Sequence, residues 1–417
     1  MDKLQEVMAL IFRLMPLIIF DPIYLLLFIT LLFIIYNQYR RVYVLQQRMF
    51  RLHRSGPLKE TLISLGYGLL GGIIASTLFV FLGFTFTGTG IIYIWFTALL
   101  LMLINPRFLC FSYAGGLISI IHLIFGVPKL SVPSIMSLVA ILHLVESVLI
   151  FLNGHKNPMP IYIKDEKGQI VGGFSLQRFW PLPLIAVLAS IELSTALEGA
   201  VAMPDWWPLL KPDLVIPAGF VLAYQLFPIF AGLGYSDLAL SSTPEKKAAY
   251  SARNLFIYSI VLLLLTMLAD RFSFLEIIPV LFAPLGHELV IYLGRQREKK
   301  RGSIFCNSDG VMVLDVYPNS PAEKMGLKAG DVILQVNDIE IESPEQLLSE
   351  MSPWLIDPTF MVKNVVEDTP KREIFFKGRV PPLGFIPAPL QNQAVYMVTK
   401  EGLLERLFKK WRGQKKE

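Results

Sequence analysis

The hydrophobic positions of this chain form long apolar runs as far as Leu293 and then give way to short alternating segments. About 20 consecutive apolar residues cross a bilayer core as a helix. On this criterion we expect about nine spanning helices. Met8–Phe20 is also apolar, but Arg13 and Pro16 interrupt it, so we expect an interfacial or re-entrant piece and not a cleavable signal. The spans are predicted near residues 18–36, 61–83, 90–104, 108–126, 133–152, 180–202, 214–233, 254–269 and 274–293.

Composition and charge agree with a membrane domain that covers residues 1–294. Only 17% of the residues are charged and 54% are hydrophobic, whereas soluble domains carry about 25% charged residues. Cytoplasmic loops of membrane proteins hold the excess of Lys and Arg. The alternate loops 37–60, 105–107, 153–178, 236–253 and 294–302 hold 19 such residues, and the opposite set holds 5. The segment that follows the last span is therefore predicted to be cytosolic.

From about residue 310 the pattern is that of a small soluble domain with short strands and helix caps. Ser320 is placed to cap a helix that begins at Pro321, and Gly326 stands where a left-handed residue would end it. The run from Ser343 to Gln346 has the form of a capping box and predicts a helix through Met351. Strands are predicted at 310–316, 332–336, 339–341, 359–366 and 372–377.

The string from Ser320 to Ile333, followed by Val336-Asn337, closely resembles a bacterial PDZ domain, and the resemblance covers roughly residues 302–390. We therefore expect a polytopic α-helical membrane domain followed by a small α+β PDZ domain of the permuted bacterial type. The resemblance implies that extended peptides, often C-terminal, bind by adding a strand to a sheet edge. Backbone amides of an apolar-Gly-apolar loop would hold the peptide carboxylate, opposite a helix.

Two segments are candidates for the carboxylate loop. The order of elements in the permuted fold favours the segment before the first strand, Gly302, Ser303, Ile304 and Phe305, with Leu347, Leu348 and Met351 on the facing helix. The alternative is Leu383, Gly384, Phe385 and Ile386, which fits the loop signature better but follows the last hairpin. This second segment could also be a closing strand with a bend at its glycine.

A PDZ domain on a polytopic membrane domain is also similar to the site-2 intramembrane metalloproteases. These enzymes need two histidines at i and i+4 of a helix, with a glutamate beside the first as general base. The last span has His287-Glu288, but Ile291 occupies the position of the second histidine. We therefore expect no metal, no cofactor and no enzymatic activity. The alternative hypothesis is a membrane enzyme or transporter, protease-like but degenerate, that the PDZ domain regulates.

Other ionisable residues lie at apparent membrane depth, where charged groups usually face the interior of a helix bundle. They form either an ion path or interhelical hydrogen bonds, and the second role is the commoner one. His143 and Glu146 share a helix face and could pair. Cys110 and Cys306 are expected to be inert, because a cytosolic domain needs no disulfide. The residues at membrane depth are His122, His143, Glu146, Glu192, Glu198 and Glu276.

Residues 400–417 carry apolar positions at helical spacing, with seven Lys or Arg against three Glu. This predicts a basic amphipathic helix that binds anionic membrane lipids or docks on the PDZ domain. Nucleic acid is not an expected partner, because the basic loops of a membrane protein explain the net charge of +5.

The whole arrangement resembles the MinJ-like cell-division topological determinants of Gram-positive rods. The resemblance implies an adaptor that binds peptide tails of partner proteins and links a DivIVA-like polar scaffold to a MinD-like ATPase of the Min inhibitor. It also implies a multi-pass protein of the cell membrane, with a cytosolic PDZ domain and enrichment at septa and poles. The residues themselves name none of these partners.

Overall fold

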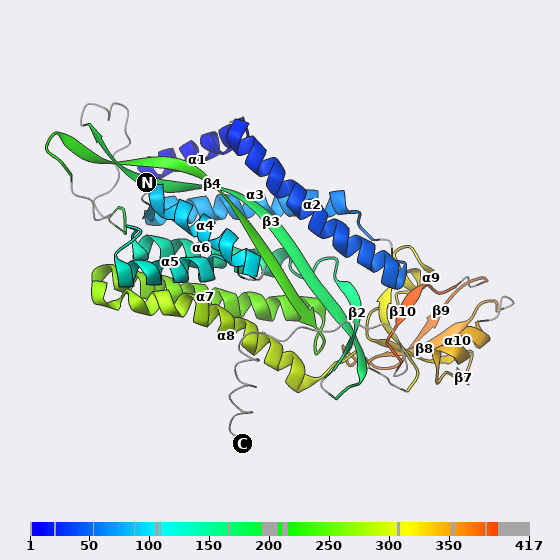
Figure 1. Cartoon of the computed structure of the whole chain (residues 1–417). Helices are drawn as coiled ribbons and strands as arrows, with labels where there is room; N and C mark the ends of the chain where they lie inside the picture. Colours follow the sequence, from blue (N-terminus) through cyan, green and yellow to red (C-terminus); the bar gives the residue numbers. More distant parts are fainter. Residues whose placement is uncertain are drawn as a thin grey trace, which may run out of the picture.

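The computed structural model describes residues 2–390 except 21, 53, 87, 105–107, 109, 166, 194–206, 211–215, 307–308, 352–354 and 380–381. The predicted tail helix at 400–417 lies outside the described residues. The described chain forms a long helical region with a smaller domain at one end (Figure 1).

Helices make up most of the first 301 residues. Among the described residues, five helices are long and apolar enough to cross a membrane. Four of them lie in α2, α3, α6 and α7, and the fifth consists of α8 and the short turn before it. Shorter apolar helices lie in α4 and α5. The chain is a membrane protein. The helices are α1 (Asp2–Phe20), α2 (Pro22–Phe50), α3 (Pro57–Leu82), α4 (Gly88–Ile104), α5 (Phe111–Phe125), α6 (Val132–Asn153), α7 (Pro244–Arg271) and α8 (Ile277–Arg301), with a 3-10 turn at Ser273–Leu275.

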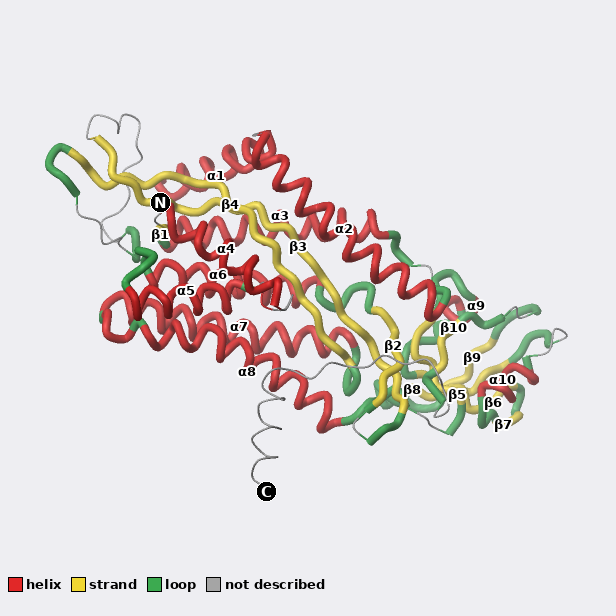
Figure 2. Tube along the Cα trace, viewed as in Figure 1, coloured by secondary structure: helices red, strands yellow, loops and turns green. Residues whose placement is uncertain are grey.

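Two of the predicted spanning helices, at 180–202 and 214–233, are wrong where the structure describes them. These segments belong to a long antiparallel hairpin of β3 (Ile170–Leu193) and β4 (Phe220–Ala239), whose paired residues run from Phe174↔Ala239 to Leu193↔Phe220. The hairpin runs along the helical region, beside α3 and α2 (Figures 1 and 2). An apolar run alone does not distinguish a buried strand from a buried helix. Two short strands, β1 (Thr85–Phe86) and β2 (Met159–Lys164), pair with β3.

A face of small residues on α3 explains why β3 lies where it does. Gly68, Gly72 and Ser76 follow one another at intervals of four residues, so they share one side of the helix. A methyl group at Gly72 would overlap the carbonyl oxygen of Pro183, and Gly68 stands equally close to another strand carbonyl. The Ser76 hydroxyl accepts a hydrogen bond of 2.8 Å from the amide of Ile185. The backbones of the helix and the strand are therefore in direct contact.

The C-terminal domain has the predicted elements, each within two residues of its expected bounds. Its sheet has the order β10-β5-β6-β8-β9, and β7 pairs with β6. Ser320 caps α9 through the amide of Glu323, and Ser343 caps α10 through the amide of Gln346, as predicted. The elements are β5 (Val311–Val316), α9 (Pro321–Lys324), β6 (Asp331–Val336), β7 (Ile339–Glu340), α10 (Pro344–Glu350), β8 (Thr359–Asn364), β9 (Arg372–Phe375) and β10 (Phe385–Pro387).

Candidate functional site

The helix α10 presents its predicted site residues to two different environments. Leu347 is 4% exposed and belongs to the hydrophobic core of the C-terminal domain. Leu348 is 74% exposed, and Met351, three residues further on, is half-buried at the edge of that core. Met351 is the C-cap residue of α10 and not part of the helix, so Leu348 is the exposed apolar residue among the three and Met351 lies between it and the core. Leu347 is a core residue, so a charge there tests folding and not binding.

The segment Leu383–Ile386 forms the start of β10 and the turn before it. Gly384 has φ of +76°, a conformation that favours glycine. Leu383 is buried in the same cluster as Leu347, and Phe385 packs at the edge of that cluster, as Met351 does. The carbonyl groups of Leu383 and Gly384 accept hydrogen bonds from the amides of α9 and the turn before it. The strand and its loop therefore belong to the same small core as α10.

The segment Gly302–Phe305 lies against the long hairpin instead. The amide of Ile304 donates to the carbonyl of Leu240, 2.9 Å away, and the Phe305 carbonyl accepts from Gly172 at 2.8 Å. The Phe305 ring is fully buried and meets the ring of Phe174 edge to face, with centroids 5.3 Å apart. Apart from bonds of the Gly302 amide to α8 and of the Phe305 amide to Ser303, the hydrogen bonds and ring contacts of this segment go to the hairpin region, and in the described chain none goes to α10.

The strand β10 lies at an edge of the sheet of the C-terminal domain. Among the described strands, β10 pairs only with β5, and it stands at one end of the order. An edge strand of this kind presents backbone groups to a further strand. Comparison with known proteins identifies the domain: residues 312–352 match the family model of the PDZ domain. The C-terminal domain is a PDZ domain.

About half of the chain is similar to a bacterial division protein. It is 25% identical over 212 residues to the cell division topological determinant MinJ of Bacillus subtilis (strain 168), an alignment that covers 51% of this chain and 50% of MinJ. The chain thus matches about half the length of this curated relative. No solved structure matches the chain.

Several contacts hold the PDZ domain against the membrane domain, and sequence reasoning did not find them. Arg54, in the turn between α2 and α3, forms an ion pair with Asp315 of β5 at 2.5 Å. The Tyr317 hydroxyl donates to the Phe50 carbonyl, and the Tyr162 hydroxyl of β2 donates to β10. Burial raises the pKa of the Asp315 carboxyl, and the Arg54 guanidinium opposes this shift. The only sequence signal for these contacts is the basic character of the loop at 37–60.

The ionisable residues of the membrane domain have partners other than those suggested by sequence. In the described chain, His143 bonds to Val139 and Cys110, and no hydrogen bond links it to Glu146. Glu192 lies on β3, where it accepts from Gln225 of β4, and Glu198 is outside the described residues. His122 bonds to the Pro128 carbonyl.

The His287-Glu288 pair has polar neighbours from other segments of the chain. His287 of α8 lies beside Cys110 and His143, which come from two other segments. The carboxylate of Glu288 is 5% exposed and accepts a hydrogen bond from the Tyr113 hydroxyl. Sequence reasoning missed this cluster because its three members are far apart along the chain.

Proposed function

We propose that this protein is a membrane-anchored adaptor whose PDZ domain binds peptide segments of partner proteins by strand addition along β10. The observation that carries the proposal is the Leu383-Gly384-Phe385 loop, which leads into an edge strand and shares a core with α10. In this arrangement the part of β10 before Pro387 pairs with the peptide, and the loop amides hold its carboxylate. Pro387 itself has no amide proton, and its carbonyl already accepts from the Tyr162 hydroxyl. Leu348 and Met351 form the side-chain wall. Gly302–Phe305, our first candidate from the order of elements, is less well placed because it packs on the hairpin.

A cytosolic position of the PDZ domain is supported by the basic loops. The loops at 37–60, 153–178, 236–253 and 294–302 all contribute residues at the PDZ end of the molecule, where Arg54, Gly172 and Leu240 contact residues 302–317. Lys and Arg collect on the cytoplasmic side of membrane proteins. Replacing two neighbouring predicted spans by one hairpin removes an even number of helical crossings, so the predicted sides of the other loops are kept.

A role in placing the division site is supported by the similarity to MinJ, which is named as a cell division topological determinant. On this proposal the PDZ groove and the membrane domain bridge a DivIVA-like scaffold and a MinD-like ATPase at septa and poles. The protein acts by binding and not by catalysis. Its tail at 400–417 adds contact with anionic lipids.

The test uses the full-length chain as a fluorescent fusion in rod-shaped cells, together with a binding assay on the detergent-purified protein against the two candidate partners. Leu348→Asp places a charge on the exposed wall of α10 and should weaken partner binding about tenfold or more and abolish septal enrichment. Phe375→Asp is the matched control, since Phe375 is similarly exposed but lies on β9, at the other edge of the sheet.

Each arm can overturn a different part of the proposal. If Leu348→Asp binds and localises like the wild type while Phe375→Asp does not, the groove lies at the β9 edge. If the wild-type fusion stains the membrane uniformly, the role in division is wrong. If neither partner binds the purified chain, the bridging role is wrong.

A further inference from the structure

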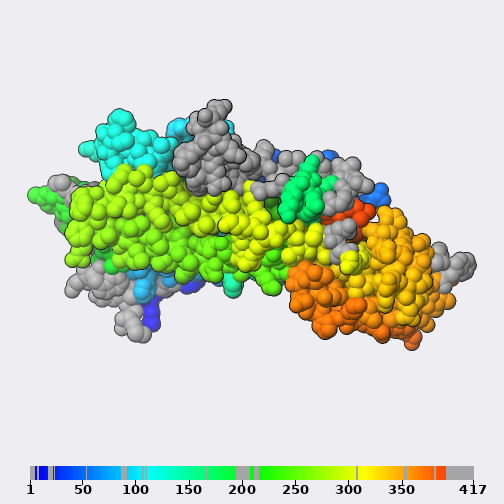
Figure 3. All heavy atoms as spheres, turned by 90° about the horizontal axis from the view of Figure 1, so that it is seen from below, coloured from blue at the N-terminus to red at the C-terminus, as the bar shows by residue number. Residues whose placement is uncertain are grey.

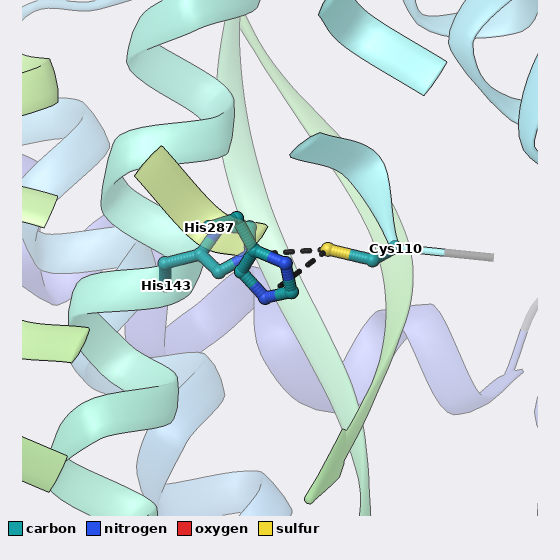
Figure 4. Close-up of side chains that lie close together, drawn as sticks. All are labelled: Cys110, His143 and His287. Carbon is teal, nitrogen blue, oxygen red and sulfur yellow. Dashed lines mark hydrogen bonds between the residues drawn. The ribbon is translucent and has the colours of Figure 1, made fainter. Parts of the chain in front are cut away.

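Three side chains with metal-binding atoms meet inside the helical region (Figure 4). Cys110 is the N-cap residue of α5, His143 lies in the middle of α6, and His287 lies in α8. The Cys110 Sγ atom is 3.1 Å from Nε2 of His143 and 4.0 Å from Nε2 of His287. All three ligand atoms lie within 4.8 Å of one another. Three segments, of which the one with His287 is more than 140 residues from the other two, therefore aim one sulfur and two nitrogens at a common point.

The spacing of these atoms is that of ligands around one tetrahedral zinc ion. With a Zn–S bond of about 2.3 Å and a Zn–N bond of about 2.0–2.1 Å, a tetrahedral angle separates sulfur from nitrogen by about 3.6 Å. The two measured distances, 3.1 and 4.0 Å, lie on either side of that value. Small side-chain rotations would therefore equalise them.

Surrounding groups orient the two imidazole rings. Nδ1 of His143 is 2.7 Å from the Val139 carbonyl, which only accepts, so Nδ1 carries the proton and the Nε2 lone pair faces Cys110. Nδ1 of His287 lies 3.4 Å from the Tyr113 hydroxyl, which donates to Glu288. Metal-binding histidines commonly have such a partner on their second nitrogen, because it fixes the tautomer and the ring direction.

Glycines bring the three helices close enough for these side chains to meet. A methyl group at Gly115 of α5 would lie 3.0 Å from Val139 of α6, and one at Gly116 would lie 2.9 Å from Pro284 of α8. The start of α5, immediately after Cys110, is thus packed between α6 and α8. His143 is 2% exposed, whereas Cys110 and His287 are partly buried, so the cluster reaches from the interior of the bundle toward its edge.

We propose that Cys110, His143 and His287 bind one Zn²⁺ ion and thereby join α5, α6 and α8. One thiolate and two neutral imidazoles form a borderline-soft donor set that suits zinc and does not suit Mg²⁺ or Ca²⁺. Binding releases the thiol proton of Cys110. Water or another ligand completes the fourth position. Ile291 therefore does not exclude a metal, because Cys110 and His143 supply the ligands that α8 lacks.

The test is the zinc content of the full-length protein, purified in detergent without chelators and dialysed in a zinc buffer. We expect about one zinc per chain, with an X-ray absorption spectrum of one sulfur at about 2.3 Å and nitrogen ligands at about 2.0 Å. Cys110→Ser, His143→Asn and His287→Asn should each weaken zinc binding at least tenfold. Cys306→Ser and His155→Asn are matched controls outside the cluster and should keep full occupancy.

A second readout is thermal unfolding with and without a chelator. The chelator should lower the unfolding temperature of the wild type and of Cys306→Ser, and leave that of Cys110→Ser unchanged, because an ion that binds only the folded state stabilises it. A wild-type protein without bound zinc, or a zinc spectrum without sulfur, would overturn the proposal. The spectrum needs no variant, so a misfolded variant does not affect that outcome.

Discussion

The membrane domain and the PDZ domain both pack a helix against a sheet, but they do so in two physically different ways. In the PDZ domain, side chains such as Leu347 of α10 and Phe360 of β8 fill the space between the layers. In the membrane domain, α3 contacts β3 almost without intervening side chains, through Gly68, Gly72 and Ser76. The first interface is held by buried apolar volume, and the second by close approach of two backbones.

This difference decides how each region should respond to mutation. Side chains in a core can move a little to accept a change of shape, at a cost of about 1–3 kcal/mol. A strand carbonyl held in a ladder of 20 residue pairs has much less freedom to move. The two regions can be seen in Figure 3, where an elongated body carries α7 and α8 on one face and the PDZ domain forms a lobe at its end.

The largest effect is expected where a side chain is added to the backbone contact. Gly72→Leu should destabilise the protein by about 3 kcal/mol or more, because the new side chain overlaps the Pro183 carbonyl. Gly66→Leu is the control on the same helix, since nothing lies within 4 Å of its added Cβ position. Thermal unfolding of the detergent-purified chain measures both. Equal unfolding temperatures would show that α3 and β3 are not in direct contact.

A smaller loss is expected in the side-chain interface of the PDZ domain. Leu347→Ala should cost about 2–4 kcal/mol through lost burial and the cavity left behind. The neighbouring Leu348→Ala should cost less than about 0.5 kcal/mol, because Leu348 is exposed. Hydrogen exchange of the β5 and β6 amides in the full chain reports both. Similar losses of protection in the two variants would place Leu348 in the core as well.

The docking contact between the two regions should depend on pH. Arg54→Met leaves the buried Asp315 carboxylate unpaired and should weaken docking by about 2 kcal/mol at neutral pH. Burial raises the pKa of Asp315 above its ordinary value, so the buried carboxyl binds a proton more readily than a solvent-exposed one does. Docking of the Arg54→Met variant is therefore favoured at a pH below the pKa that the Asp315 carboxyl has when exposed to solvent. This advantage is lost as the pH rises through the higher pKa that the carboxyl has when buried.

Hydrogen exchange near Tyr317, measured from pH 5 to pH 8, should accordingly show that Arg54→Met loses the most protection, relative to the wild type, at the highest pH. The double variant Arg54→Met/Asp315→Asn should recover most of the docking, because no buried charge remains. A deficit that is independent of pH and persists in the double variant would mean that the ion pair does not hold the domains together.

The smallest effect concerns one hydrogen bond at the α3–β3 contact. Ser76→Ala leaves the amide of Ile185 without its acceptor and should cost about 1 kcal/mol. Thr77→Ala is the matched control, because the Thr77 hydroxyl bonds only to a carbonyl of its own helix. Thermal unfolding measures the pair. A larger loss for Thr77→Ala would contradict the assigned role of Ser76.

The PDZ domain could be predicted from the sequence because its signals are local. Ser320 and Ser343 cap their helices through amides three residues away, and Gly326 adopts positive φ where the turn requires it. Alternation of apolar residues then placed the strands. The helices α6, α7 and α8 were also predictable, because each is a continuous apolar run long enough to cross a membrane.

Only the tertiary structure decided which apolar runs became strands. The run that begins near Pro181 has the hydropathy of a spanning helix, but it forms a strand that pairs with β4 and lies against the glycine face of α3, more than 100 residues earlier in the chain. The candidate carboxylate loop depends in the same way on which strand pairs with β5. The cluster of Cys110, His143 and His287 joins three distant segments. Hydropathy, caps and turns depend on neighbours in sequence, whereas backbone contacts and ligand sets depend on neighbours in space.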